Sequence, residues 1–548
     1  MIITVLLTFS QKKVTMNRFF ISLFLFPLFF FNSSAQQSAK WGDQGDGTYC
    51  NPVLPADYSD IDAIRVGSDY YAISSTFQYL PGVVMLHSKD LVNWEILSHV
   101  VNDLTVISPE LNWDKMNRYG KGIWAGSIRY YKGRFWVYFG TPDEGFFMSS
   151  AKNPAGPWEP LHALWKVSGW DDCCSFCDDN GQLYFIATNF ALYQKTNKKY
   201  NIHLFRLTSD GKSIIMESDS IIHQSNGSEA NKLYKMNGLY YHYFSEIKKE
   251  GRVIMMRRSK TIYGPWETKQ LNHVDKNTDR EPNQGGLIQA RTGEWFFFTH
   301  HGSGGNWDGR VASLLPVNWI NGWPIIGAVG SDSIGNMVWR GKKPVKKALK
   351  LRIKTSDEFN QKTLPAQWEW NYQPRNENWS LMERKGFLRL YAFQPIRPLD
   401  KNKLIFRAGN TLTQRSFRSS VNEVIIKMEI SAMANGQYAG LTHYASSFST
   451  FGVIQHDGVK TLSYNNNGDI STGISITAQT VWLKSGWGWD GISKYSFSLD
   501  GKAFTDFGDS YQLSWGNYRG DRVGIFNYNV LENKGYVDVD YFHYTYKQ

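Results

Sequence analysis

Residues 51–95 read NPVLPADYSDIDAIRVGSDYYAISSTFQYLPGVVMLHSKDLVNWE and contain the pattern that decides the fold. Acidic residues open the stretch, and a strand-like run over 64–66 enters a Gly67-Ser68-Asp69 turn and leaves over 70–73. Short β-branched and aromatic runs on both sides of a glycine turn predict a β-hairpin. The stretch ends on Asn93-Trp94-Glu95, and because this ending recurs later, it indicates a repeat architecture.

Four further turn-and-strand units follow before residue 330. They are Lys132-Gly133-Arg134-Phe135-Trp136, Asn180-Gly181-Gln182-Leu183-Tyr184, Asn237-Gly238-Leu239-Tyr240-Tyr241 and Thr292-Gly293-Glu294-Trp295-Phe296. The unit ending recurs as Gly156-Pro157-Trp158-Glu159 and Gly264-Pro265-Trp266-Glu267, and Asn321-Gly322-Trp323-Pro324 closes the series. Five units of about 55 residues with several short strands each predict a five-bladed β-propeller. A long β-sandwich would not explain a fixed repeat.

The sequence after the repeats predicts a second all-β domain. Seven positive charges fall within residues 342–354, and a basic run of this kind is more typical of a solvated connector than of a binding site. Beyond it the chain alternates as strands, for example over 387–390, 424–430, 495–499 and 536–541. We predict a propeller over 36–335, a basic linker over 336–354 and a jelly-roll-like β-sandwich over 355–548, which is either structural or binds polysaccharide.

The first 35 residues are predicted to be a secretory signal peptide. From Met16 the chain has a short basic opening at Asn17-Arg18, an apolar run over 19–31 and small residues ending at Ala35. The apolar run is shorter than the ~20 residues of a spanning helix, which argues against a membrane anchor. No later segment is long and apolar enough to span a bilayer. We therefore expect an exported protein, periplasmic or extracellular, that is cleaved after Ala35.

The composition argues against a nucleic-acid partner and a zinc site. Three charges of the net +11 leave with the signal peptide and seven lie in the linker, so the remainder is near neutral. Cys173, Cys174 and Cys177 form one cluster and Cys50 stands apart, whereas a zinc site normally needs two paired ligand sets. We expect buried thiols. The 21 Trp and 30 Tyr suit all-β packing and the apolar faces of sugars.

Three acids fall at matching positions of three repeats. Asp60, Asp172 and Glu229 each lie 11 or 12 residues before an aromatic residue of the second strand in their unit. Each is expected to begin the innermost strand of a different blade, and these strand starts converge at one mouth of a propeller channel. Trp124 and Gln284 occupy the equivalent positions of the other two units. Acids beside an aromatic ring and an amide predict a carbohydrate site.

The chain resembles glycoside hydrolase family 43, in the branch of α-L-arabinofuranosidases and β-xylosidases with a C-terminal β-sandwich. The resemblance covers nearly the whole mature chain. Its motifs are Asp60-Ile61-Asp62-Ala63-Ile64-Arg65-Val66-Gly67, Ser74-Ser75-Thr76-Phe77 with Pro81-Gly82, His87-Ser88-Lys89-Asp90-Leu91-Val92-Asn93-Trp94, Gly122-Ile123-Trp124-Ala125, and Gly309-Arg310 before Leu315-Pro316-Val317. Each motif alone is weak evidence, and together they are strong.

The resemblance implies that Asp60 is the general base, Glu229 the general acid, and Asp172 the residue that tunes the pKa of the acid and holds the sugar. Inverting hydrolysis needs an acid to protonate the leaving oxygen and a base to activate water on the opposite face. Two positions depart from the family pattern, Ile61 in place of Pro and Gly126-Ser127 in place of Pro-Asp. The first leaves Asp62 as a rival base, and Glu246 and Glu281 are rival acids.

Further residues are expected at the same site. Phe77 and Trp124 are predicted to line the first sugar subsite, with ordinary packing as the alternative, and Gln284 is predicted to contact the sugar. Arg310 is predicted to bond a sugar hydroxyl or an acid, with a structural ion pair as the alternative. Hydrolysis by these groups requires no cofactor. His300 or His301 is a candidate ligand for a structural calcium ion, because some relatives hold one in the channel, and ordinary structure is the alternative.

The function predicted from these features is an exported, exo-acting glycosidase that removes arabinofuranosyl or xylosyl units from plant cell-wall polysaccharide or oligosaccharide. A noncatalytic carbohydrate-binding propeller is one alternative, although retention of all three acids argues against it. A retaining enzyme that processes fructosyl sugars is another, and the family motifs argue against it. The residues leave the choice between arabinose and xylose open.

Overall fold

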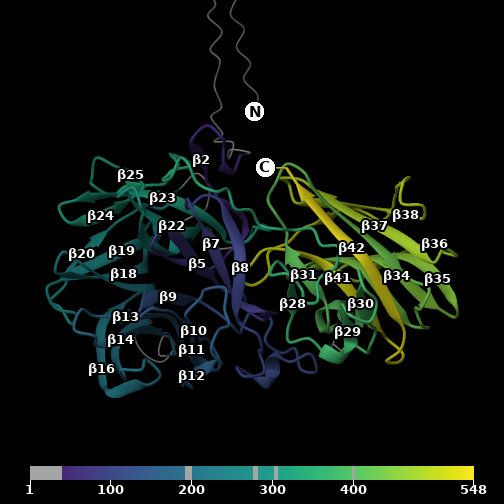
Figure 1. Cartoon of the computed structure of the whole chain (residues 1–548), viewed down its shortest axis with the longest axis horizontal. Helices are drawn as coiled ribbons and strands as arrows, with labels where there is room; N and C mark the ends of the chain where they lie inside the picture. The colour runs from purple at the N-terminus through teal and green to yellow at the C-terminus, as the bar shows by residue number, and fades with distance from the viewer. Residues whose placement is uncertain (1–39, 192–199, 276–281, 302–305, 398–400, 548) are drawn as a thin grey trace, which may run out of the picture. The chain divides into compact units, whose positions relative to one another are not determined.

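The computed structural model describes residues 40–191, 200–275, 282–301, 306–397 and 401–547. Ser38–Gln548 form one compact unit, and its described part is built from β-strands (Figure 1). The helices in this part are the 3-10 segments η1 (Pro109–Leu111), η2 (Asn376–Asn378) and η3 (Lys401–Arg407). None of them is long and apolar enough to cross a membrane. The predicted signal peptide, residues 1–35, lies outside the described residues.

Five antiparallel sheets of four strands follow one another along the chain from β4 to β24. The first two contain β4 (Asp62–Val66), β5 (Asp69–Ser74), β7 (Gly82–Ser88) and β8 (Trp94–Val101), then β9 (Gly126–Tyr131), β10 (Arg134–Thr141), β11 (Gly145–Ala151) and β12 (His162–Trp165). The third and fourth contain β13 (Trp170–Cys177), β14 (Leu183–Asn189), β15 (Tyr200–Leu207) and β16 (Ile214–Ser225), then β17 (Glu229–Met236), β18 (Leu239–Lys248), β19 (Gly251–Ser259) and β20 (Glu267–Gln270). The fifth contains β21 (Pro282–Gln289), β22 (Trp295–His301), β23 (Val311–Ile320) and β24 (Trp323–Ile326).

The first strands of the five sheets form a closed ring. β4 contacts β9, β9 contacts β13, β13 contacts β17, β17 contacts β21, and β21 contacts β4 again. β3 (Leu54–Asp57), which precedes the first sheet in sequence, pairs with β23 of the fifth and so ties the start of the chain to the last blade. The predicted all-β propeller is confirmed.

The repeated glycines lie in the turns between the first and second strands of each blade. Their φ angles are 62° at Gly67, 70° at Gly133, 83° at Gly181, 75° at Gly238 and 103° at Gly293. An added Cβ would meet no atom within 4 Å, so lack of space is not the reason for glycine. The left-handed backbone is the reason, because a side chain makes positive φ costly.

The second domain is a β-sandwich of two sheets, as predicted. One sheet has the strands β36 (Asp469–Ser475), β35 (Val459–Asn466), β34 (Phe448–His456), β33 (Gln437–Tyr444), β41 (Arg522–Asn529), β31 (Leu412–Arg415), β28 (Glu369–Asn371) and β6 (Tyr79–Leu80). The other has β29 (Trp379–Ser380), β30 (Leu388–Tyr391), β42 (Tyr536–Tyr546), β32 (Asn422–Glu429), β37 (Thr480–Trp487), β38 (Ile492–Ser498), β39 (Thr505–Asp506) and β40 (Tyr511–Gln512). Because β6 comes from the propeller, backbone hydrogen bonds join the two domains.

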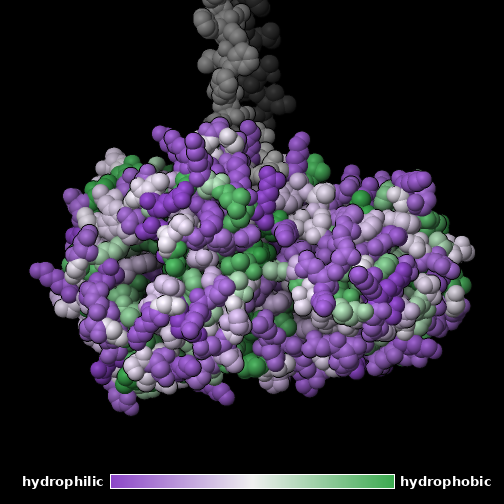
Figure 2. All heavy atoms as spheres, in the orientation of Figure 1, coloured by the Kyte–Doolittle hydropathy of each residue, from purple (hydrophilic) through white to green (hydrophobic). Residues whose placement is uncertain are grey.

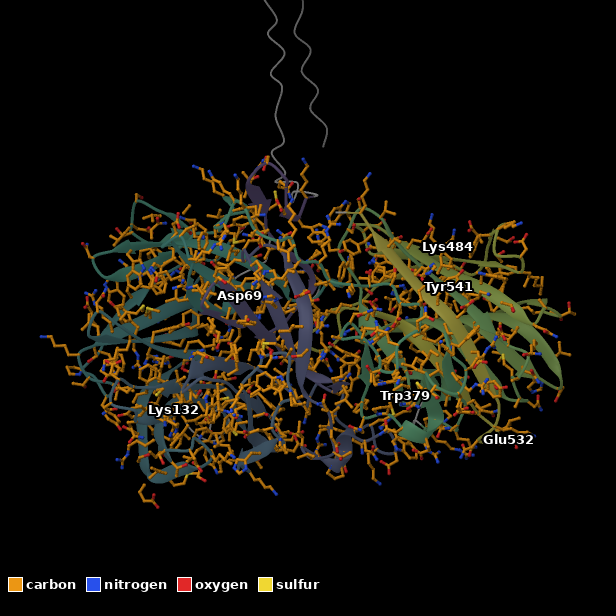
Figure 3. All side chains as sticks on the ribbon, in the orientation of Figure 1. Asp69, Lys132, Trp379, Lys484, Glu532 and Tyr541 are labelled. Carbon is orange, nitrogen blue, oxygen red and sulfur yellow. The ribbon has the colours of Figure 1, made fainter. Side chains whose placement is uncertain are left out.

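The outer face of the second sandwich sheet is partly polar. Lys484 of β37 and Tyr541 of β42 lie near one another on it (Figure 3), and both are half-buried while their chain neighbours Leu483 and Phe542 are buried. This alternation is expected for strands with one face on the core. The side of the molecule seen in Figure 2 is mostly hydrophilic, with apolar atoms in small separate patches.

The basic run is solvated apart from one residue. Lys343 is buried, with its Nζ 2.8 Å from Asp43 Oδ2 and 3.0 Å from Asp90 Oδ2, whereas the other six cations of 342–354 are exposed. Within this run β27 (Arg340–Lys342) pairs with β2 (Thr48–Cys50), which pairs with β1 (Gly42–Asp43). The short strands β25 (Ala328–Val329) and β26 (Gly335–Asn336) pair just before it. All four cysteines are free thiols, and all except Cys177 are buried.

Candidate active site

A pocket of about 240 Å³ opens where the innermost strands of the propeller begin. Its lining residues are Asp60, Phe77, Trp124, Ala125, Asp171, Asp172, Thr188, Phe190, Tyr200, Glu229, Asn283, Gln284, Arg310 and Tyr518. The structure therefore brings together the three predicted acids with the predicted sugar contacts Phe77, Trp124, Gln284 and Arg310. Propeller residues up to 250 positions apart in sequence share one cavity because the blades bring their strand starts to the same ring.

Local backbone irregularities aim the three acids into this pocket. Asp60 lies two residues before β4, Asp172 is the third residue of β13, and Glu229 is the first of β17. The strand register shifts between Asp171 and Cys174 in β13 and between Glu229 and Lys232 in β17. Such bulges re-aim a side chain. Asp60 and Asp172 also have φ of 57° and 53°, a strained conformation that clusters at functional sites.

Three hydrogen bonds fix the position of Asp60. Its Oδ1 accepts from Arg310 Nη1 at 3.0 Å and its Oδ2 from Ser75 Oγ at 2.7 Å, while its backbone N–H donates to His300 Nδ1 at 2.7 Å. The side chain is 7% exposed. A buried carboxylate with a charged and a neutral donor is fixed in orientation and remains able to accept a proton from water.

Asp172 and its neighbour Asp171 form a buried carboxyl pair. Burial, followed by the charges of Glu229 and Asp60, raises the pKa of Asp172 to about 7. Burial and the adjacent Asp172 also raise the pKa of Asp171 well above its usual range. Asp172 Oδ2 accepts the backbone N–H of Ala230, the residue after Glu229. Burial and mutual repulsion therefore both favour the protonated forms of Asp171 and Asp172.

Glu229 is the most solvent-accessible of the three predicted catalytic acids. Its side chain is 28% exposed, and its Oε1 lies 3.2 Å from Arg252 Nη1. Arg252 is itself anchored by hydrogen bonds to Gly227 O at 2.7 Å and Ser245 Oγ at 3.1 Å. A carboxyl at the open side of the pocket is well placed to reach a departing sugar oxygen.

The sandwich contributes Tyr518 to the pocket lining. Tyr518, on the loop before β41, has φ of 71° and is 47% exposed. Its ring meets Trp124 edge-on at 5.9 Å between centroids, and the Arg310 guanidinium lies 5.0 Å above it. The next residue, Arg519, is buried and donates to Gln78 Oε1 at 2.9 Å, beside Phe77. Tyr518 and the pocket residues Asp171, Thr188, Phe190, Tyr200 and Asn283 were not predicted from the sequence.

Family models and known proteins match this architecture along its length. Residues 49–324 match the model described as glycosyl hydrolases family 43, and residues 356–545 match the one described as beta xylosidase C-terminal concanavalin A-like domain. A protein named beta-xylosidase from Formosa agariphila is 35% identical, over 93% of this chain and 92% of its own. The chain belongs to glycoside hydrolase family 43.

Other family 43 proteins agree with this assignment. A non-reducing end alpha-L-arabinofuranosidase from Bacteroides ovatus is 30% identical over 63% of this chain and 65% of its own. The crystal structure of the GH43 BlXynB protein from Bacillus licheniformis has a TM-score of 0.77 at 26% identity, and it covers 91% of this chain and 100% of that one. The resemblance seen in the sequence is confirmed, and this family 43 protein is a glycosidase.

Two of the three rival acids, Asp62 and Glu246, are absent from the pocket lining of this family 43 enzyme. Asp62 is fully buried and its Oδ2 is 2.6 Å from Arg129 Nη1, so it is engaged in an internal ion pair. Glu246 lies 3.3 Å from His223 Nε2 and also pairs with Lys248. Neither lines the pocket. Glu281 lies outside the described residues.

The two histidines predicted as calcium ligands are both buried behind the pocket lining. His300 is buried, accepts the N–H of Asp60, and has a pKa well below its usual range because of burial and the charge of Arg310. His301 is buried and packs 6.0 Å from Trp339. Calcium prefers six to eight oxygen ligands. In the described parts of the chain no group of three or more His, Cys, Asp or Glu is placed to hold a metal, and the calcium site stays a prediction.

Proposed function

We propose that this family 43 glycosidase is an exported, inverting, exo-acting enzyme that removes single xylosyl or arabinofuranosyl units from plant cell-wall polysaccharide or its fragments. The observation that carries the proposal is the meeting of Asp60, Asp172 and Glu229 in one pocket. A volume of about 240 Å³ is below the roughly 300–1,000 Å³ typical of pockets for larger ligands, and suits one terminal sugar. Export rests on the predicted signal peptide.

The proposed mechanism divides the work among the three acids. Glu229 protonates the glycosidic oxygen as the sugar leaves, while Asp60, ionised and oriented by Arg310 and Ser75, takes a proton from the attacking water on the opposite face. Asp172 couples to both through charge, and its position against the Ala230 N–H holds it beside the acid. Trp124 and Tyr518 supply apolar ring surface for the sugar.

Chromogenic substrates test the proposal on the protein lacking residues 1–35. We expect nitrophenol release from nitrophenyl β-D-xylopyranoside or α-L-arabinofuranoside, and less from the β-D-glucopyranoside, whose extra hydroxymethyl group a site selective for pentosides does not accommodate. The relatives named beta-xylosidase, which match along most of their length, make the xyloside the first substrate to test. Absence of turnover on both pentosides would favour a binding propeller, and release of fructose from sucrose would favour the retaining alternative.

A further inference from the structure

A fully buried lysine lies beneath the catalytic pocket. Lys232 of β17 is three residues after Glu229, within the same bulged segment, and its exposed fraction is 0%. Its Nζ lies 3.5 Å from Oε1 of Gln284, which lines the pocket. A buried ammonium is costly unless opposite charge lies near it. Lys232 is therefore expected to have a role in the charge balance of this region.

The ion pairs of the pocket leave two acids without a partner at close range. Arg310 pairs with Asp60 and Arg252 pairs with Glu229. Within the described residues neither Asp171 nor Asp172 has a cation at ion-pair distance, and Asp171 Oδ1 is buried without a hydrogen-bond donor. Lys232 is a further buried cation, and its charge acts on Asp172. Two buried carboxyls and one buried ammonium would then share the centre of the ring.

The electrostatics agree with this placement. Burial, Glu229 and Asp60 raise the pKa of Asp172, and the charge of Lys232 opposes them. The same charge helps to lower the pKa of His300. The charged and titratable groups facing this centre include Asp60, Asp171, Cys173, Glu229, Tyr243, Arg252, His300, His301 and Arg310. The charge of Lys232 therefore acts both on Asp172 and on His300.

We propose that Lys232 is a positioning residue that balances the charge of the Asp171–Asp172 pair from inside the propeller and holds the Gln284 amide against the bound sugar. The expected kinetic effect of Lys232 rests on the proposed function. Its expected effect on stability does not. An ammonium placed here keeps a negative charge on the pair at working pH, when burial alone would protonate both acids. Lys232 thereby links Gln284, which lines the pocket, to the Asp171–Asp172 pair.

Two variants separate the charge of Lys232 from its volume. Lys232→Met removes the charge and keeps most of the chain length, and Lys232→Arg keeps the charge. In Lys232→Met we expect the acidic limb of the kcat/KM profile between pH 4 and 9 to move up by at least about half a pH unit, because Asp172 ionises less readily without the nearby cation. Lys232→Arg is expected to keep the midpoint of the limb near that of the wild type. An unmoved limb in a folded Lys232→Met protein would overturn the proposal.

A charge-compensating double variant keeps the proposal testable if Lys232→Met does not fold. Without Lys232 the carboxyl pair must keep an uncompensated charge or bind an extra proton at pH 7, and both cost stability, whereas an amide at position 171 avoids both. We therefore expect Lys232→Met/Asp171→Asn to melt at least about 5 °C above Lys232→Met by circular dichroism. Equal or lower melting of the double variant would contradict the charge balance. The melting comparison needs no substrate. It therefore tests the charge balance even if the protein shows no glycosidase activity, a result that would refute only the proposed function.

Discussion

Replacing Asp60 with Asn is expected to lower kcat by about 10²–10⁴-fold on every substrate, because the amide cannot take the proton of the attacking water. Glu229→Gln is expected to show a loss of the same size on xylobiose. On a nitrophenyl glycoside its loss should be smaller, because nitrophenolate leaves with little need for a proton. Steady-state kinetics of both variants on both substrates checks the two roles separately.

Glu246→Gln is the matched control for these variants. Glu246 belongs to the same blade as Glu229 and is also paired with cations, but it does not line the pocket. We expect this variant to keep wild-type turnover. Retention of more than a tenth of wild-type kcat in Asp60→Asn, with an unchanged melting temperature, would show that another group activates the water.

Replacing Glu369 with Gln is expected to lower the free energy of unfolding by about 3–5 kcal/mol, because the change leaves buried arginines without their counter-charge. Glu369 of the sandwich is fully buried, with Oε1 2.8 Å from Arg415 Nη1 and Oε2 2.7 Å from Arg522 Nη1. Arg415 Nε also donates to the Asp57 carbonyl at 2.6 Å, three residues before Asp60. Denaturant unfolding of the whole chain measures the loss.

The exposed pair of Glu358 and His543 provides the control for this prediction. Its atoms are 2.6 Å apart on the sandwich surface, and both side chains are more than 40% exposed. Exposed pairs contribute about 0–1 kcal/mol, so Glu358→Gln should have little effect on unfolding. If Glu369→Gln costs no more than Glu358→Gln, the buried network between sandwich and propeller is not what stabilises the junction.

The fold was predictable because the propeller repeats one hairpin five times. Gly67 and its four equivalents need a left-handed backbone in every blade, so their spacing is visible in the sequence. Asp60, Asp172 and Glu229 were found for the same reason, since symmetry relates their positions. Asp171 was missed although it adjoins Asp172, because nothing in the spacing distinguishes two neighbouring acids.

Residues brought in from outside the repeat could not be predicted. Tyr518 comes from a sandwich loop with its own left-handed backbone, and no periodicity connects it to Trp124, which it meets. The burial of Lys343 depends on Asp43 and Asp90, which are far from it in sequence. Such contacts arise only when two domains or distant strands pack, and a single sequence has no local signal for them.

The most direct test of the account is the configuration of the first sugar released, followed by proton NMR within the first minutes of hydrolysis of nitrophenyl β-D-xylopyranoside or α-L-arabinofuranoside, whichever the enzyme cleaves. A base that activates water on the face opposite the leaving group predicts initial release of the anomer opposite to that of the substrate, followed by slow mutarotation. Initial release of the same anomer as the substrate would contradict the account, because it would make Asp60 a nucleophile instead of a base.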